Sequence, residues 1–306
     1  MNVFRLGTRG SPLALTQARM VADALRAAHG WPTHAVETVV IRTTGDRVQD
    51  RPLAEIGGKA LWTKELDRAL LAGEVDACVH SMKDVETIRP AAIAIAAMLP
   101  RADVRDRLIG AESIGAIPRG ATVGTSSPRR RAQLLRLRPD LRVVPIRGNV
   151  DTRLAKLAAA EVDATLLAAA GLDRLDRPEV GSAVPTDVML PAPAQGAVGV
   201  EVRADDARAP ALVAAIDHAD THRCVLAERA LLAGLRADCH SPVAALASLA
   251  GETLRLRASL LAEDGSSEIC AALEGTGPEV GPEVGAELAA ELLAQAPPAI
   301  RQLFGA

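Results

Sequence analysis

The sequence contains almost no aromatic residues. Its 306 residues include two Trp, two Phe and no Tyr. Proteins that bind single-stranded nucleic acid stack bases on aromatic side chains, so this composition argues against that class. The formal net charge is −3 and the pI is near 6.1, whereas nonspecific binding to nucleic acid needs a basic surface. The arginine-rich stretch GTSSPRRRAQ, at 124–133, is therefore a local feature that points to a small anionic ligand.

Long apolar runs are also missing. No stretch reaches the roughly 20 apolar residues of a membrane span, and the N-terminus lacks the basic-then-apolar pattern of a signal peptide. We therefore expect a cytoplasmic protein. The cysteines are far apart and show no metal-ligand spacing, so we expect reduced, mostly buried thiols and no metal site at Cys78, Cys224, Cys239 and Cys270.

Phosphate-binding loops are missing as well. The segment EIGGKAL, at 55–61, contains GGK, but Leu53 stands where a P-loop needs its first glycine. Ala60 replaces the Ser or Thr that would bind magnesium, and no GxGxxG follows a predicted strand. A ligand with several carboxylates is therefore favoured over a phosphate.

Three sequence patterns occur twice, in the same order. Residues 4–25 predict a strand, a turn at Gly7 and a helix with Ser11 as N-cap and Pro12 in its first turn, and 121–137 repeat this pattern with Ser127 and Pro128. The segment 39–46 parallels 143–151, and 73–81 parallels 160–168. These matches predict two copies of one α/β domain with a mostly parallel sheet.

The predicted fold class is α/β, with two similar domains like those of periplasmic binding proteins around a hinged cleft. A smaller α+β domain follows, with a three-stranded antiparallel sheet and helices on one face. Proline clusters mark hinges at about 98–101 and 193–196. We expect domain 1 to comprise 1–97 and 197–216, domain 2 to comprise 102–192, and domain 3 to comprise 219–306.

Arginines gather at the predicted cleft. Helix N-termini after Ser11 and Ser127 direct backbone N–H groups and a positive dipole end toward it. We expect ligand-facing arginines beside these turns, at strand ends, and on or near helix starts, at Arg9, Arg42, Arg129, Arg130, Arg147, Arg153 and Arg174. A planar guanidinium suits carboxylates, and several of them suggest a ligand with many carboxylates. A solvated helix face is the interpretation for Arg131, Arg136 and Arg138.

Two further positions are candidates for chemistry. The buried strand Ala77–Val79 ends in a polar burst that includes Lys83 and Asp84. That pair is either a surface ion pair or, if Asp84 faces the cleft, a functional carboxylate that holds or passes protons. Cys239 lies in the polar loop LRADCHSPVA, at 235–244, which indicates an attachment point rather than a buried structural thiol.

Seven motifs together resemble the porphobilinogen deaminase (hydroxymethylbilane synthase) family across the whole chain: TRGSPLAL, GGKALWTKEL, VHSMKDV, GTSSPRRRAQL, IRGNVDTRL, LPAPAQGAVGVE and AERALL. The resemblance implies a cytoplasmic, monomeric transferase of tetrapyrrole and heme biosynthesis. Such enzymes carry a dipyrromethane cofactor on a cysteine that matches Cys239. They add four porphobilinogen molecules to it with loss of ammonia, and water then releases hydroxymethylbilane.

The resemblance also implies residue roles. Asp84 matches the family's catalytic aspartate, which contacts pyrrole N–H groups and stabilises cationic intermediates. Trp62 matches an aromatic position on a mobile segment. Carboxylate binding or guidance of the growing chain is implied for Arg9, Ser11, Gln17, Lys59, Lys83, Ser127, Arg129, Arg130, Arg147, Arg153, Arg174 and Gln195.

The chain departs from the family pattern at three places. Glu55 stands where many bacterial members have Lys, Ala237-Asp238 precede the cysteine where Gly-Gly is frequent, and Pro128 replaces a common Leu. Two other classes stay open on architecture alone. A solute-binding protein would share the hinge but normally carries an export signal, and a nucleic-acid-binding regulator would need a helix-turn-helix.

Overall fold

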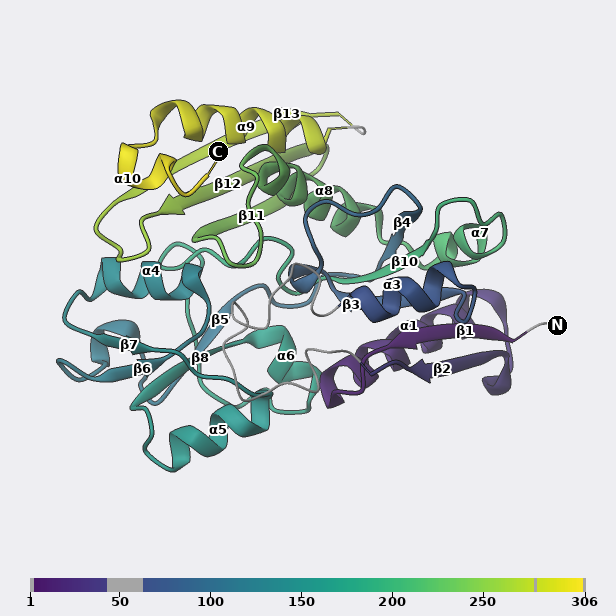
Figure 1. The fold of residues 1–306 in the computed structure, drawn as a ribbon, viewed down its shortest axis with the longest axis horizontal. Coiled ribbons are helices and arrows are strands. Elements are labelled where there is room, and N and C mark those ends of the chain that lie inside the picture. Colours follow the sequence, from purple (N-terminus) through teal and green to yellow (C-terminus); the bar gives the residue numbers. More distant parts are fainter. Residues whose placement is uncertain (1–2, 43–62, 278–279, 305–306) are drawn as a thin grey trace. The chain divides into compact units, whose positions relative to one another are not determined.

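The computed structural model describes residues 3–42, 63–277 and 280–304 (Figure 1). The chain divides into two compact units. The first comprises Met1–Ala102 and Gly196–His222, and the second comprises Asp103–Gln195 and Arg223–Ala306. Among the positions singled out from the sequence, Glu55, Lys59 and Trp62 lie outside the described residues.

The first unit is built on a five-stranded mixed sheet of order β2-β1-β3-β10-β4. Its strands are β1 (Phe4–Thr8), β2 (Val36–Val40), β3 (Ala77–Ser81), β4 (Ile93–Met98) and β10 (Val198–Arg203). Strands β1, β2 and β3 are parallel, and β10 runs antiparallel to both β3 and β4. Short 3₁₀ turns lie at Thr33–Ala35, Met82–Asp84 and Ala214–Ile216.

Helices cover both faces of this sheet. Alternate residues of a strand point to opposite faces, so Ala77 and Val79 pack with α1 (Pro12–His29) and α7 (Ala209–Val213). Cys78 instead packs with α3 (Lys64–Leu71) on the other face.

The second unit contains a sheet with the same arrangement, of order β7-β6-β8-β5-β9. Its strands are β5 (Asp106–Ile109), β6 (Thr122–Gly124), β7 (Arg142–Val144), β8 (Ala164–Ala168) and β9 (Ser182–Ala183). Its helices are α4 (Pro128–Leu137), α5 (Val150–Ala158) and α6 (Ala169–Arg174), with a 3₁₀ turn at Ile114–Ala116.

The two α/β sheets confirm the internal repeat. In each, three neighbouring strands are parallel and the fourth, β10 or β5, is antiparallel to both of its neighbours. The sheets are therefore mixed rather than mostly parallel. Each of these antiparallel strands begins shortly after the chain passes from one unit to the other, β5 after residue 102 and β10 after residue 195. A helical crossover is needed only between parallel strands, so none is needed to place these two.

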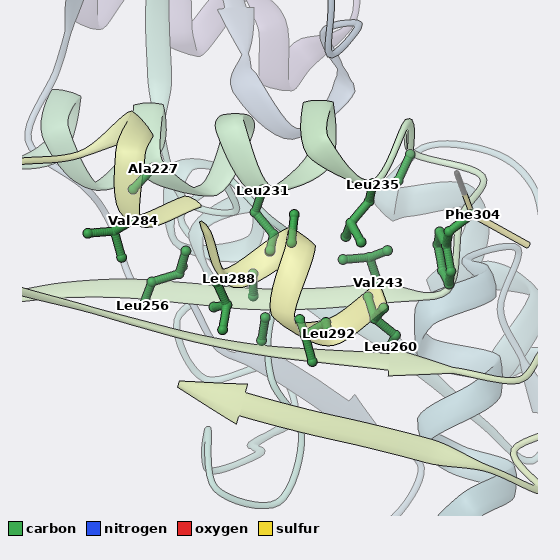
Figure 2. Packing of buried hydrophobic residues seen from close by; sticks show 14 of the residues in the cluster. Ala227, Leu231, Leu235, Val243, Leu256, Leu260, Val284, Leu288, Leu292 and Phe304 are labelled. Atoms are coloured by element: carbon green, nitrogen blue, oxygen red, sulfur yellow. The ribbon is translucent and has the colours of Figure 1, made fainter. Parts of the chain in front are cut away.

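The second unit also contains the predicted α+β part. Strands β11 (Val243–Ala250), β12 (Thr253–Leu261) and β13 (Glu268–Thr276) form the antiparallel sheet, with helices α9 (Pro282–Gln295) and α10 (Pro298–Arg301). Helix α8 (Ala219–Gly234) belongs to this part from Arg223 onward. Figure 2 shows Leu231 of α8 and Leu288 of α9 meeting Leu256 of β12 in one apolar layer. The predicted fold class is thus confirmed.

Two local expectations need correction. Strand β1 runs through Gly7 to Thr8, so the turn falls at 9–11 instead of at Gly7, because the parallel pairing with β2 extends to Thr8. Cys78 and Cys224 are buried as expected, but Cys270 is exposed, because alternate residues of β13 face away from the core.

Candidate active site

A pocket in the first unit lies where β1 and β3 end. It is lined by Arg9, Ser11, Gln17, His80, Ser81 and Asp84, together with Leu13, Ala14, Thr63, Val79 and Val85. Parallel strands present their carboxyl ends at the same edge of a sheet, and that places the two polar turns side by side. The structure therefore brings four of the sequence-predicted residues, Arg9, Ser11, Gln17 and Asp84, into one pocket.

The pocket wall is held by hydrogen bonds. Ser11 caps α1, because its side-chain oxygen accepts from the backbone N–H of Ala14 at 3.3 Å. The buried Gln17 donates from Nε2 to Ser81 Oγ at 2.7 Å, which ties α1 to the end of β3. These contacts confirm the predicted N-cap and give Gln17 a defined partner.

Asp84 is presented by a 3₁₀ turn that follows β3 directly. The strand extends through His80 and Ser81, two residues beyond the predicted end, and the turn Met82–Asp84 begins at once. Met82 is buried beneath the turn, Lys83 is half-buried and Asp84 is exposed. The turn therefore anchors its apolar residue in the core and leaves the Asp84 carboxylate accessible at the pocket.

A buried charge cluster lies behind this turn. His80 Nε2 is 3.1 Å from Glu201 Oε2, and Glu201 is fully buried. Arg89 joins Glu201 to Asp67 and Glu86. Burial alone would raise the pKa of Glu201, but His80 and Arg89 outweigh it and lower that pKa to about 2. The cluster thus holds an ionised glutamate in the centre of the sheet.

In the second unit, Ser127 caps α4 by accepting from the backbone N–H of Arg130 at 3.4 Å, and Pro128 is the first helical residue, as predicted. Arg129 and Arg130 are buried, with 3% and 6% of their surface exposed. Both form ion pairs with Asp106, at 2.8 and 2.7 Å. Two of the arginines expected to face a ligand therefore already have an internal carboxylate partner.

Three further arginines, Arg131, Arg136 and Arg138, were expected on a solvated helix face. Arg131 and Arg136 are exposed, and Arg131 donates to the carbonyl oxygen of Val143 at 2.9 Å. Arg138 is half-buried and donates to the carbonyl oxygen of Ile114 in the 3₁₀ turn at 3.0 Å and to that of Ile117, which follows the turn, at 2.9 Å. The solvated-face interpretation agrees with the exposure of Arg131 and Arg136. It is wrong for Arg138, which follows α4 as its C-cap and is half-buried against these carbonyl oxygens.

Three more predicted arginines lie in the second unit. Arg147 has a buried Nη1 with no hydrogen-bond partner among the residues described. Arg153, in α5, donates from Nε to the carbonyl oxygen of Gly148 at 2.9 Å. Arg174 is the last residue of α6 and not near a helix start, because α6 begins immediately after β8 without an intervening loop. Burial lowers the pKa of Arg174.

Gln195 is buried in the segment between β9 and β10. Its Nε2 donates to the carbonyl oxygen of Val104 and to Asp106 Oδ1, each at 2.8 Å. Its neighbour Ala194 adopts a positive φ of 61°, and its N–H is bonded to the buried carboxylate of Glu228. The predicted hinge segment is therefore held by hydrogen bonds to two buried carboxylates, those of Asp106 and Glu228.

Cys239 is exposed on a turn between α8 and β11. Asp238 shapes this turn, because its Oδ1 accepts from the backbone N–H of His240 at 2.8 Å and its own N–H donates to Ser241 Oγ at 3.1 Å. The positive φ near the cysteine falls on Arg236, at 51°, and not on Ala237 or Asp238. The turn therefore does not require glycine at 237 and 238, where Gly-Gly is frequent in the family that the sequence resembles.

Comparisons with known proteins cover nearly the whole chain. A family profile described as "Porphobilinogen deaminase, dipyromethane cofactor binding domain" matches residues 4–211, and one described as "Porphobilinogen deaminase, C-terminal domain" matches 222–294. The porphobilinogen deaminase of Sphingopyxis alaskensis is 58% identical over 309 residues, covering 99% of this chain and 97% of the relative. The chain belongs to the porphobilinogen deaminase family. The relative from Paracoccus denitrificans is 55% identical over 280 residues, covering 90% of this chain and 89% of its own.

Solved structures with a similar arrangement include periplasmic binding proteins. A TRAP periplasmic solute binding protein from Ochrobactrum anthropi matches with a TM-score of 0.40 and 11% identity, over 70% of this chain and 72% of that one. A periplasmic His/Glu/Gln/Arg/opine family-binding protein from Silicibacter pomeroyi matches with a TM-score of 0.37 and 16% identity, over 70% and 88%.

Two buried acids of this porphobilinogen deaminase family member were missed by the sequence analysis. Asp106 pairs with arginines 23 and 24 positions away, and Glu201 pairs with Arg89 across 112 positions. A pattern of neighbouring residues in the sequence does not predict ion pairs between such distant positions. A sequence signal exists for Glu201, which interrupts the apolar strand β10, where charge is rarely buried unpaired. Asp106 begins the strand DRLI beside another charged residue and carries no such signal. Within the described part of the chain, no helix is long and apolar enough to cross a membrane, and no His, Cys, Asp and Glu cluster suits a metal ion.

Proposed function

We propose that this chain is a hydroxymethylbilane synthase that carries a dipyrromethane on Cys239 through a thioether. It adds four porphobilinogen molecules in turn, with release of one ammonia for each, and water then frees the linear tetrapyrrole. The observation that carries the proposal is the exposed thiol of Cys239 on a polar turn, in a chain of this family whose Cys78 and Cys224 are buried.

The residues present fit such a cofactor. Each pyrrole brings two carboxylates, so a growing chain accumulates negative charge that needs cationic partners once it leaves bulk water. Two buried guanidinium nitrogens, Arg129 Nε and Arg147 Nη1, have no acceptor in the part of the chain that the structure describes and are available for that charge. When bound, the dipyrromethane supplies the pyrrole carbon to which the next unit is added.

Asp84 has the position for the acid–base and electrostatic part of the reaction. Its carboxylate is exposed in a pocket with Arg9 and beside the N-terminus of α1. We assign it to accept hydrogen bonds from pyrrole N–H groups and to stabilise the positive charge that develops as ammonia leaves porphobilinogen. Carboxylate binding is proposed for Arg9, Ser11, Gln17, Lys59, Lys83, Ser127, Arg129, Arg130, Arg147, Arg153, Arg174 and Gln195, and for Trp62 the aromatic role that the family resemblance implies.

The proposal extends to the organisation of the chain. We propose three domains, at 1–97 with 197–216, 102–192 and 219–306, with hinges at about 98–101 and 193–196. Each of the three sheets supplies the core of one of them. We further propose that the protein acts as a monomer in the cytoplasm.

The test is the intact mass of protein purified from cells. We expect an excess equal to one dipyrromethane in the wild type and in Cys270→Ser, and none in Cys239→Ser. Cys270 is the matched control because it is also an exposed cysteine of the second unit. A folded wild-type protein without the excess would overturn the covalent assignment.

Asp84 is tested by Asp84→Asn, with the exposed Asp205→Asn as its control in the same unit. We expect Asp84→Asn to abolish porphobilinogen consumption while the fold is kept. Substantial turnover in Asp84→Asn would refute its role.

A further inference from the structure

Asp106 stands at the centre of the arginine cluster of the second unit. It is the first residue of β5, and its side chain is 1% exposed. It accepts from Arg129 Nη2 at 2.8 Å, from Arg130 Nη2 and Nε at 2.7 and 3.2 Å, and from Gln195 Nε2 at 2.8 Å. One buried carboxylate therefore contacts three of the residues assigned above to ligand binding.

Electrostatics explains why the arginines need this partner. Two adjacent guanidiniums are buried at the N-terminal end of α4, where the helix dipole is positive, so burial, mutual repulsion and the dipole all oppose their charges. Burial lowers the pKa of Arg129 and would raise that of Asp106, but the two guanidiniums outweigh burial and hold the pKa of Asp106 far below its ordinary value. The Asp106 carboxylate is thus ionised and offsets one of the two positive charges.

The geometry also leaves donors unused. Asp106 and the carbonyl oxygens of Leu190 and Leu166 engage the terminal nitrogens of both arginines. Arg129 Nε is buried and has no acceptor among the described residues. A cluster with one excess positive charge and a buried donor without an acceptor is suited to one more anion.

We propose that Asp106 is a positioning residue, which fixes the Arg129 and Arg130 guanidiniums and the Gln195 amide in the orientation that receives carboxylates of the pyrrole chain. The inference rests on the proposed function and assigns a role to a residue that has had none. Asp106 does not touch the ligand in this proposal; it acts through its three donors.

The test is Asp106→Asn, which keeps the shape of the side chain and removes its charge. Losing a charge-assisted hydrogen bond corresponds to roughly a tenfold effect or more on ligand binding. We expect the KM for porphobilinogen to rise by about tenfold with a smaller change in kcat. We also expect a lower fraction of freshly purified protein to carry the dipyrromethane mass, a readout that does not depend on turnover.

The matched control is Asp173→Asn. Asp173 forms an ion pair with Arg107, the residue after Asp106 in β5, at 2.8 Å, and touches none of the donors bonded to Asp106. The variant Asp173→Asn therefore shows how much the loss of a neighbouring ion pair changes the KM and the fraction of protein that carries dipyrromethane. We expect neither to change by more than about twofold, since such partly exposed pairs contribute little.

A second variant keeps the proposal testable if Asp106→Asn does not fold. Asp106→Asn combined with Arg130→Gln removes one anion and one cation together, so the buried charge stays balanced. We expect this double variant to fold and to show larger KM and loading defects than Arg130→Gln alone, because Arg129 and Gln195 also lose the carboxylate that orients them.

The outcomes separate cleanly. Suppose that folded Asp106→Asn keeps the wild-type KM and carries as much dipyrromethane as the wild type, whereas Arg130→Gln is impaired. That result would overturn the positioning role and leave Asp106 a structural residue. Defects in the double variant no larger than those of Arg130→Gln alone would also overturn it. Absence of the dipyrromethane mass from the wild type would instead be a failure of the proposed function, and the two failures are therefore distinguishable.

Discussion

Arg89 donates two parallel hydrogen bonds to Glu201, from Nε to Oε1 and from Nη2 to Oε2, each 2.8 Å long. The same guanidinium contacts Asp67 and Glu86, while His80 contacts the Glu201 carboxylate from the pocket side. Arg89 therefore connects the loop after Asp84 to α3 and to β10, an interior strand of the sheet. The turn that carries Asp84 thus lies in the chain between His80, which contacts Glu201, and Glu86, which contacts Arg89.

Replacing Arg89 with Met should destabilise the first unit strongly. Removing one partner of a buried ion pair leaves uncompensated charge, at a cost of about 3 to 5 kcal/mol. Denaturant unfolding followed by the fluorescence of Trp31, which packs against Phe4 in the same unit, measures the loss. Arg68→Met on the exposed face of α3 is the control and should change the free energy of unfolding by less than about 0.5 kcal/mol. A loss below about 1 kcal/mol in Arg89→Met would contradict the role given to the cluster.

The acid stability of the first unit should depend on Glu201. Its pKa is about 2 in the folded chain against an ordinary value of 4.5. Because this pKa is lowered, ionised Glu201 adds about 3 kcal/mol to the free energy of unfolding. That stabilisation is fully present above about pH 4.5 and is lost as the pH falls toward 2. Burial raises the pKa of Asp67, so that carboxyl works in the opposite direction and favours the folded chain at low pH.

Glu201→Gln isolates this contribution. The free energy of unfolding, measured between pH 2 and 5, should fall less steeply with acidification in the variant than in the wild type. The variant is less stable near pH 5, and the difference from the wild type narrows toward pH 2, so the diagnostic quantity is the difference in slope. Parallel pH profiles for the two proteins would show that Glu201 is not ionised through its buried contacts.

Local chemistry made part of this structure predictable. Ser11 and Ser127 each cap a helix, as a serine directly before proline predicts. The repeated motifs predicted two similar domains, and the two sheets have the same topology. The partners of Arg129 and Arg130 were not predictable. Asp106 reaches them only because β5 joins the sheet in antiparallel orientation beside β8, which is a tertiary result without a signature in the sequence of α4. The arginines were correctly singled out, and their internal partner was not.

Gly199 should be intolerant of a side chain because of Met82. A Cβ at Gly199 would lie 2.2 Å from Met82 Sδ, and Met82 opens the turn that carries Asp84. Gly199→Ala should therefore cost about 1 to 3 kcal/mol and lower porphobilinogen consumption, because Met82 is displaced and moves the turn. Gly115→Ala, where the nearest atom is 3.9 Å away, is the control.

The double variant Gly199→Ala with Met82→Ala tests the mechanism. The clash is absent when the Met82 side chain is truncated, so the two changes should be non-additive by about 0.5 to 3 kcal/mol in stability. Recovery of activity relative to Gly199→Ala would place the effect on the turn. Strict additivity would show that Gly199 acts through some other contact.

Asp238 should influence the rate at which dipyrromethane becomes attached to Cys239, the proposed attachment cysteine. Its Oδ1 holds the turn around Cys239 through His240 N–H, so Asp238→Ala loosens the turn, whereas Asp238→Asn keeps an acceptor oxygen at the same place. Loss of one such hydrogen bond is worth about 1 kcal/mol, or roughly fivefold. We expect apo-protein of Asp238→Ala to acquire the dipyrromethane mass about fivefold more slowly when incubated with porphobilinogen, and Asp238→Asn to match the wild type. Asp264→Ala is the matched control, because Asp264 Oδ1 holds an equivalent turn through Ser266 N–H at 3.0 Å. Equal rates for Asp238→Ala and Asp264→Ala would mean that the turn around Cys239 is organised without Asp238.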